Sequence, residues 1–403
     1  MAGEGAPRKV LYVLDSLGLS GRTKGIIDLA LNLDAARFEP VFCTLSDEQS
    51  ALRDRLMDLR VPLEQLTVGA GLRVSTVGSL GAIIRRHDVQ VVHSVNPRPM
   101  LYAGLAARLG GVRATIGSLS AFACQVPDRK YRFLPQDLVN RGTRNAWRNQ
   151  VVARLTRFVV AVSRGLGERF CRFTSEASGP LRWIGHEALL EKLRVISYGV
   201  DVAAYDAVSA EERAAMRARL GATADTVLVG SVGRLIEQKD YPTQLRAFAL
   251  ASQREPRLRM VLAGDGPLRT SIESLSAELG ITDRLTLLGH WTAVPLLIRS
   301  LDAFVLASKF EPYGVALLEA KAAGVAIVST RVNEIPSLVA DNASGLLVPP
   351  ESPSEMADAL VRLARDPELR RSLGRNAARD ARRRHAIKAT ALAYQDLYDD
   401  ATK

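Results

Sequence analysis

Two glutamates, Glu311 and Glu319, are the residues whose type and spacing first suggest chemistry in this sequence. Seven residues separate them, and most of these favour a helix, which would place the carboxylates roughly 12 Å apart along its axis. Carboxylates accept hydrogen bonds from hydroxyl groups, so such a pair could hold both the sugar and the ribose of a nucleotide sugar. By itself the pattern fits equally well an acid at a helix start followed by a solvated helix residue.

The segment around these glutamates is expected to form a strand, a tight loop, a helix and a second strand. The apolar run 303–308 predicts a buried strand, Pro312 and Gly314 end it, and residues 315–323 favour a helix. A second apolar run, 325–330, follows at once. Two strands joined through a helix favour parallel pairing, and the amides at the helix start favour an anionic group.

Length and composition indicate a globular protein with more than one core. A chain of 403 residues is long enough for two domains, and its 47% hydrophobic and 24% charged residues are ordinary for that class. No uninterrupted apolar run approaches the roughly 18 residues of a membrane span, and residues 1–9 lack the apolar core of a signal peptide. Cys43, Cys124 and Cys171 lack metal-binding spacing and suit a reducing compartment. We therefore expect a cytoplasmic protein, or one peripheral at the inner face of a membrane.

The formal net charge of +11 is concentrated in part of the chain. Residues 128–172 carry eleven Lys or Arg against three Asp or Glu, a net of +8, with aromatic side chains interleaved. This segment favours an anionic partner, which could be a membrane surface contacted through residues 129–172 or a nucleic acid. Nucleic acid is the weaker hypothesis because the sequence holds no recognisable recognition module. An ordinary pair of solvated helices is a third interpretation.

Apolar runs alternate with helical periods in the first half, which is the pattern of a parallel sheet covered on both faces. The first strand, expected at residues 9–14, precedes a loop in which Gly18, Ser20 and Gly21 lead into a helix. Backbone amides of such a loop can approach a phosphate closely, although many such loops are only turns. Neither half carries the glycine spacing of the dinucleotide fingerprint, which excludes a two-domain dehydrogenase.

The alternation restarts near residue 226, and four short motifs follow in the second half. They are Ser231-Val232-Gly233-Arg234 with Lys239, Gly264-Asp265-Gly266-Pro267, Leu288-Gly289-His290-Trp291, and the segment from Glu311 to Glu319. In this order and at this spacing they resemble the retaining, GT-B type glycosyltransferases of family 4, also called group 1 glycosyltransferases. The resemblance covers roughly residues 226–349.

The resemblance implies a role for each motif. Arg234 and Lys239 would bind the donor diphosphate and stabilise its charge without a metal, although taken alone they could be surface charges. Glu311 would contact the donor sugar, and Glu319 would hold the ribose. No metal and no other cofactor is expected. We predict a donor site formed by Gly18, Ser20, Gly21, Gly233, Arg234, Lys239, Gly264, Gly266, His290, Glu311, Tyr313, Gly314, Val315 and Glu319, of which Glu311, Arg234 and Lys239 would be catalytic.

The first half resembles the family in architecture more than in residues. Ligands of parallel sheets gather where strands end, so we expect the acceptor side to include His93, Asn96, Gly117 and Ser118. A histidine at the position of His93 is also a common structural hydrogen-bonding residue.

Three departures from the family pattern fall in this half. Gly117 stands where many members carry a histidine that contacts the donor sugar. The run Ser20-Gly21-Arg22-Thr23-Lys24 stands where two glycines and an acid are usual, and Tyr198 replaces an asparagine. The implied diphosphate site is unaffected, whereas the residues near the sugar and the acceptor differ from the pattern.

We therefore predict an α/β protein of the GT-B type, with two Rossmann-like, doubly wound parallel-sheet domains facing across a cleft. Residues 1–203 would bind the acceptor, residues 204–384 would bind the nucleotide sugar, and residues 385–403 would form a helix that crosses back to the first domain. The resemblance implies a retaining transfer of a hexosyl or N-acetylhexosaminyl group from a UDP- or GDP-sugar, in polysaccharide, glycolipid or small-molecule glycoside biosynthesis. The alternative is a non-catalytic protein of the same shape with a decayed sugar site.

Overall fold

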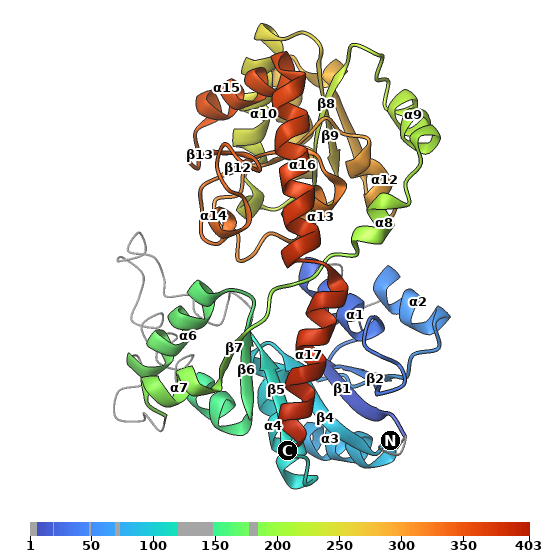
Figure 1. The fold of residues 1–403 in the computed structure, drawn as a ribbon, viewed down its shortest axis with the longest axis vertical. Helices are drawn as coiled ribbons and strands as arrows, with labels where there is room; N and C mark the ends of the chain where they lie inside the picture. The colour runs from blue at the N-terminus through green and yellow to red at the C-terminus, as the bar shows by residue number, and fades with distance from the viewer. Residues whose placement is uncertain (1–5, 19, 48–49, 69–72, 120–147, 177–183) are drawn as a thin grey trace. The chain divides into compact units, whose positions relative to one another are not determined.

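The structure is a computed structural model that describes residues 6–18, 20–47, 50–68, 73–119, 148–176 and 184–403. The chain forms two compact units (Figure 1), one made of Met1–Tyr198 with Lys388–Lys403 and the other of Gly199–Ile387. Each unit is built on a parallel sheet with helices packed against it, which confirms the predicted fold class. The division after Tyr198 comes slightly earlier in the chain than the boundary expected at residue 203.

The first unit contains a seven-stranded sheet in the order β3-β2-β1-β4-β5-β6-β7. Its inner strands are continuous apolar runs, as expected for strands covered on both faces. The strands are β1 (Arg8–Leu14), β2 (Phe38–Thr44), β3 (Leu63–Gln65), β4 (Val89–Val95), β5 (Ala114–Ser118), β6 (Phe158–Ala161) and β7 (Leu193–Val195). The helices are α1 (Gly21–Leu31), α2 (Ala51–Asp58), α3 (Val74–Arg86), α4 (Pro97–Leu109), α6 (Arg164–Glu176), α7 (His186–Lys192) and α17 (Ile387–Thr402).

The second unit contains a six-stranded sheet in the order β10-β9-β8-β11-β12-β13. The strands are β8 (Val227–Val232), β9 (Leu258–Ala263), β10 (Leu285–Gly289), β11 (Ala303–Leu306), β12 (Ala326–Thr330) and β13 (Leu346–Val348). The helices are α8 (Val202–Asp206), α9 (Ala210–Arg219), α10 (Tyr241–Arg254), α11 (Arg269–Glu278), α12 (Val294–Arg299), α13 (Val315–Ala323), α14 (Ile335–Leu338), α15 (Pro353–Arg365) and α16 (Pro367–Arg384), with short 3-10 turns at Glu237–Lys239 and Thr282–Arg284.

A buried polar cluster fixes α17 to the sheet of the first unit. His93 is fully buried at the end of β4, where its Nδ1 lies 2.7 Å from the hydroxyl of Tyr398 and its Nε2 lies 2.7 Å from Oγ of Ser118. The hydroxyl of Tyr12 lies 3.0 Å from that of Tyr398. Burial lowers the pKa of His93 to about 3, so the ring is neutral and donates through one nitrogen while accepting through the other.

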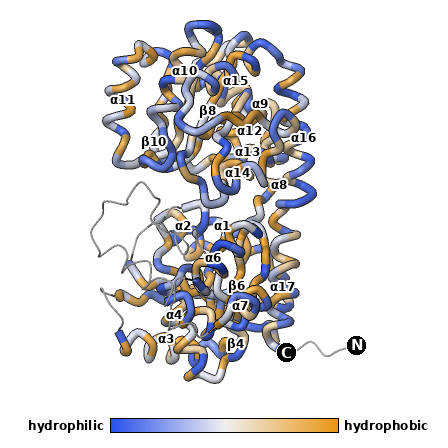
Figure 2. Tube along the Cα trace, turned by 90° about the vertical axis from the view of Figure 1, so that its left-hand side faces the viewer, coloured by the Kyte–Doolittle hydropathy of each residue, from blue (hydrophilic) through white to orange (hydrophobic). Residues whose placement is uncertain are grey.

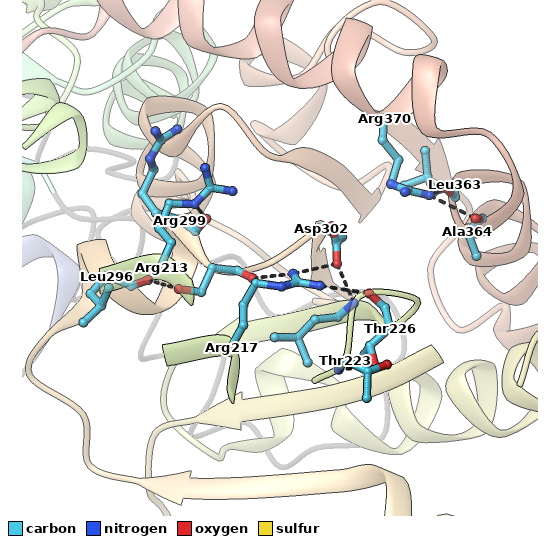
Figure 3. Close-up of polar contacts among 12 residues, drawn as sticks. Arg213, Arg217, Thr223, Thr226, Leu296, Arg299, Asp302, Leu363, Ala364 and Arg370 are labelled. Carbon is cyan, nitrogen blue, oxygen red and sulfur yellow. Dashed lines mark hydrogen bonds and ion pairs between the residues drawn. The ribbon is translucent and has the colours of Figure 1, made fainter. Parts of the chain in front are cut away.

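The amino edge of the second sheet is held to α9 by one arginine (Figure 3). Arg217 donates to the Asp302 carboxylate at 2.9 Å and to the carbonyl of Thr226 at 2.9 Å. The same carboxylate accepts from the backbone amide of Leu228 at 2.8 Å, at the second residue of β8. This network joins the starts of β8 and β11. They lie at the amino edge of the sheet, opposite to the carboxyl edge where ligands are expected.

Helix α16 packs closely on α13, the helix that carries Glu319. Figure 2 shows α16 as mostly hydrophilic, and its buried residues Leu373, Ala377 and Ala381 recur every four positions on one face. Next to them a Cβ added to Gly374 would lie 2.1 Å from the carbonyl oxygen of Gly324, so only glycine permits this approach.

A buried ion pair crosses the same interface. Lys321 on α13 is fully buried, and its ammonium donates to Asp380 at 2.5 Å and to the carbonyl of Leu338 at 2.6 Å. Burial would raise the pKa of Asp380, but hydrogen bonds from Arg384 and Lys321 outweigh it and hold the pKa at about 2.

Asp380→Asn is expected to destabilise the second unit by about 3–5 kcal/mol, because it leaves the buried ammonium of Lys321 without a carboxylate. Lys321→Met, which removes the buried charge and leaves Asp380 paired with Arg384, should cost less. Because the pKa of Asp380 is lowered on folding, its contribution is present at neutral pH and lost as the pH falls from about 4 to about 2. Urea unfolding of both variants measures the difference, and equal stability of Asp380→Asn and wild type would contradict it.

Candidate active site at the carboxyl edge of the second sheet

Strands β8 and β11 are neighbours in the second sheet. After β8 the chain continues to β9, toward one edge of the sheet, and after β11 it continues to β12, toward the other edge. Such a topological switch point is where open parallel sheets bind ligands, just beyond the carboxyl ends of the strands. The loop after β8 carries Arg234 and Lys239, and the loop after β11 carries Glu311.

An ion pair joins these two loops. The ammonium of Lys239 lies 2.5 Å from Oε2 of Glu311, and the exposed fractions of the two side chains are only 15% and 8%. Ser308 donates its hydroxyl to the same oxygen at 3.2 Å. The backbone amide of Glu311 donates to the side chain of Asn333 at 3.1 Å, which fixes the loop that presents the carboxylate.

Glu319 is held in the helix that begins beside this pair. Gly314, the N-cap residue before α13, has a φ of 94°, in the left-handed region that favours glycine. Within the described part of the chain no side chain caps this helix start, so its first amides can receive an anion. Tyr313 is buried, Val315 is half-buried, and Glu319, about one turn after the first residue of the helix, is 7% exposed.

Three successive loops at this edge pack backbone against backbone. The amide of Gly264 donates to the carbonyl of Gly289 at 2.7 Å, and the amide of Gly233 donates to the carbonyl of Ala263 at 2.9 Å. A Cβ added to Gly264, whose φ is 139°, would lie 1.9 Å from the Gly233 oxygen. A Cβ added to Gly266 would lie 2.5 Å from the carbonyl oxygen of Leu235. These glycines therefore permit a contact that no other residue allows.

The side chains of Arg234 and His290 are exposed near the starts of the loops after β8 and β10. Tyr241, the first residue of α10, donates its hydroxyl to the carbonyl of Gly233 at 3.1 Å, and burial raises its pKa. Sequence reasoning missed Tyr241, Ser308 and Asn333 as supports of the site. The position of Ser308 directly after a strand could have indicated it, whereas Asn333 comes from a later loop and has no local signal.

The predicted residues Gly18, Ser20 and Gly21 belong to the first unit and form a separate group. Ser20 caps α1 by accepting from the amide of Thr23 at 3.2 Å, and the amide of Gly18 donates to Oγ of Ser16 at 3.2 Å. Their role toward a donor stays a prediction.

Three of the four residues predicted for the acceptor side are buried in the structure. A Cβ added to Gly117 would lie 2.0 Å from Cε of Met100 and 3.1 Å from Cγ2 of Thr156, so a side chain there would enter the core. His93 and Ser118 are buried and bonded to each other, as described above. Burial gives these residues a structural role, and their role toward an acceptor stays a prediction.

Two family models match nearly the whole described chain. The model "Glycosyltransferase Family 4" matches residues 20–204, and the model "Glycosyl transferases group 1" matches residues 212–380, which include every loop of the switch point. The chain belongs to glycosyltransferase family 4. This confirms the resemblance drawn from the four motifs.

Individual relatives agree with this assignment. A D-inositol 3-phosphate glycosyltransferase of Saccharomonospora viridis is 36% identical over 227 residues, which cover 54% of this chain and 52% of the relative. An alpha-D-kanosaminyltransferase of Streptomyces kanamyceticus is 34% identical over 190 residues, 47% of this chain and 49% of the relative. The matched part therefore spans about half the length of these curated relatives.

Solved structures show the same fold. The Anabaena protein HepE, crystallised in complex with UDP, superposes with a TM-score of 0.79 at 19% identity, covering 97% of this chain and all of that chain. It has also been crystallised with UDP-glucose.

Proposed function

We propose that this protein transfers a glycosyl group from a nucleotide sugar to a hydroxyl group of an acceptor, and that the donor binds at the switch point of the second unit. The Lys239–Glu311 ion pair carries the proposal, since it places a cation and a carboxylate together beside an uncapped helix start. Family membership and the related structures with UDP and UDP-glucose support a UDP-hexose as the donor.

The diphosphate of the donor would bind Arg234, Lys239 and the first amides of α13. Lys239 pairs with Glu311 in the structure, so the arriving diphosphate would share or replace that partner. Two fixed cations would then stabilise the dianion that forms when the sugar–phosphate bond breaks. Glu319 would hold the ribose, and Glu311 the sugar hydroxyls beside the breaking bond.

The proposed stereochemical outcome is retention. The acceptor hydroxyl would attack the anomeric carbon from the face that the diphosphate leaves, and the departing diphosphate would take the hydroxyl proton. This route requires no separate acid and base pair of the kind that hydrolases use. The anomeric configuration of the product, measured by NMR, tests this assignment.

Turnover should survive the removal of divalent metal ions. Arg234 and Lys239 would supply the positive charge that a metal supplies in transferases with a carboxylate metal motif. Assays in excess EDTA should retain the wild-type rate. A complete loss of turnover that Mg²⁺ or Mn²⁺ restores would contradict this prediction.

Release of the nucleoside diphosphate from UDP-, GDP- and ADP-sugars tests the proposed function itself. We expect slow hydrolysis of at least one of them without acceptor. Binding of a nucleotide with no hydrolysis or transfer under any condition would favour the alternative, a binding protein of the same fold.

The basic segment of the first unit could contact a membrane surface. Within the described residues no helix is both long and apolar enough to cross a membrane. We propose peripheral contact with anionic lipid through residues 129–172, of which 129–147 lie outside the described residues, as does Cys124. The described remainder exposes Arg154, Arg157, Arg164, Arg169 and Arg172. Failure to sediment with anionic vesicles at low salt would remove this proposal.

A further inference from the structure

The first sheet has its own switch point, between β1 and β4, and a chain of polar side chains crosses it. Asp15 follows β1, Asn96 follows β4, and Arg22 lies in the first turn of α1. The Asn96 amide donates to Oδ2 of Asp15 at 2.8 Å, and Arg22 donates to Oδ1 of Asn96 at 2.5 Å. Asn96, one of the residues predicted for the acceptor side, directly follows β4, at an edge where parallel sheets bind ligands.

The backbone of Asn96 is strained. Its φ of 80° and ψ of 152° fall in a region that residues other than glycine rarely occupy. Such a conformation persists only where the surroundings hold it, and it is common at ligand sites. Here it directs the Asn96 amide so that one end faces Asp15 and the other end faces Arg22.

Positively charged side chains outnumber negatively charged ones in the group formed by Asp15, Arg22, Asn96 and Arg148. Asp15 interacts electrostatically with Arg148, whose Nε is buried without a hydrogen-bond partner among the described residues. Arg22 donates to the neutral amide of Asn96 rather than to a carboxylate. The group therefore holds two guanidinium groups and one carboxylate, and the buried Nε of Arg148 has no acceptor among the described residues, which a bound anion would supply.

Two departures from the family pattern meet at the same place. The run Ser20-Gly21-Arg22-Thr23-Lys24 stands where the family usually has two glycines followed by an acid, which makes this helix start more positive than the usual one. Tyr198, which replaces an asparagine, interacts electrostatically with Arg22 and lies against α1, where a Cβ on Gly25 would be 3.1 Å from its ring. The departures are thus changes of one site and not scattered substitutions.

We propose that the acceptor of this enzyme carries an anionic group, a phosphate or a carboxylate, which Arg22 and Arg148 bind while Asn96 orients Arg22. The inference rests on the proposed function, because it assigns the first unit to the acceptor. If Arg22 served only to fix Asn96, the site would have no affinity for anions beyond general screening.

The test is a calorimetric titration of inorganic phosphate into UDP-saturated protein at constant ionic strength. Wild type should bind phosphate saturably, and Arg22→Met should bind it about 10- to 100-fold more weakly, as expected for a lost charged hydrogen bond. The matched control is Arg113→Met, which removes an exposed arginine just before β5, at the amino edge of the same sheet. It should bind phosphate as wild type does.

The variant Thr23→Glu, which restores an acid at this helix start, is a second test in case Arg22→Met does not fold. Glu at this position can form a capping box with Ser20, so the helix should be retained while phosphate binding is lost. Competition by glucose 6-phosphate and by glucuronate, each compared with glucose, separates a phosphate-bearing acceptor from a carboxylate-bearing one.

No saturable binding of phosphate by wild type, or equal binding by Arg22→Met and Arg113→Met, would overturn the inference. UDP affinity should be the same in all four proteins. If UDP fails to bind wild type, the proposed donor site is wrong. The phosphate titrations of Arg22→Met and Arg113→Met can then be compared without UDP, and they still decide whether the anion site exists.

Discussion

Replacing Lys239 with methionine is expected to lower kcat by about 100- to 1000-fold, the range found when one preorganised donor to a developing anion is removed. In the structure Lys239 is the cation of the switch point that contacts Glu311, and the proposed diphosphate would take its place as partner. Steady-state kinetics with the best UDP-sugar measures the effect. The reason for a large kcat effect is that the diphosphate gains negative charge only as the bond breaks.

The control for this variant is Lys309→Met. Lys309 lies in the loop that carries Glu311, is exposed, and pairs with Glu351 at 3.1 Å. Its loss removes the same charge from the neighbouring loop and should leave kcat within about twofold. Equal effects of the two variants would mean that general electrostatics, and not a contact with the diphosphate, explains the loss.

The two glutamates should fail in different ways. Glu319→Ala removes proposed ribose contacts that the bound donor and the transition state share, so it should raise KM and weaken UDP binding with little change in kcat. Glu311→Ala removes contacts that strengthen as the sugar gains oxocarbenium character, so it should mainly lower kcat. Each charged hydrogen bond is worth on the order of 1.5–3 kcal/mol, or roughly 10- to 150-fold.

Kinetics on both variants, with UDP affinity measured separately, distinguishes these outcomes. Ser308→Ala is a useful companion because it removes a hydrogen bond to Glu311 at 3.2 Å and leaves the carboxylate in place. It should lower kcat less than Glu311→Ala does. Unchanged UDP affinity in Glu319→Ala would refute the ribose assignment, and wild-type turnover in both glutamate variants would refute the enzyme hypothesis.

The second unit was largely predictable because its signals are local. Apolar runs, the break at Pro312 and Gly314 and the helix-favouring segment after them lie within a few residues of each other, and the structure has β11 and α13 where they indicate. The ion pair between Lys239 and Glu311 joins residues 72 positions apart. The sequence analysis placed both residues in the donor site but did not predict that they pair, because the contact depends on how the loops after β8 and β11 meet at the edge of the sheet.

The first unit was predicted less well because burial depends on tertiary contacts. His93 and Ser118 lie at strand ends, as predicted, but α17 brings Tyr394 and Tyr398 over them from more than 270 positions along the chain. The direction of a Cβ at Gly117, toward Met100, likewise depends on how α4 packs. No local pattern contains this information.

Titration of UDP into wild type and into Arg234→Met/Lys239→Met, followed by calorimetry, tests the central claim that the switch point of the second unit holds the nucleotide. Wild type should bind UDP, Lys309→Met should match it, and the double variant should bind at least about 100-fold more weakly, since two charged contacts are lost. A double variant that remains folded and binds UDP as tightly as wild type would contradict the account.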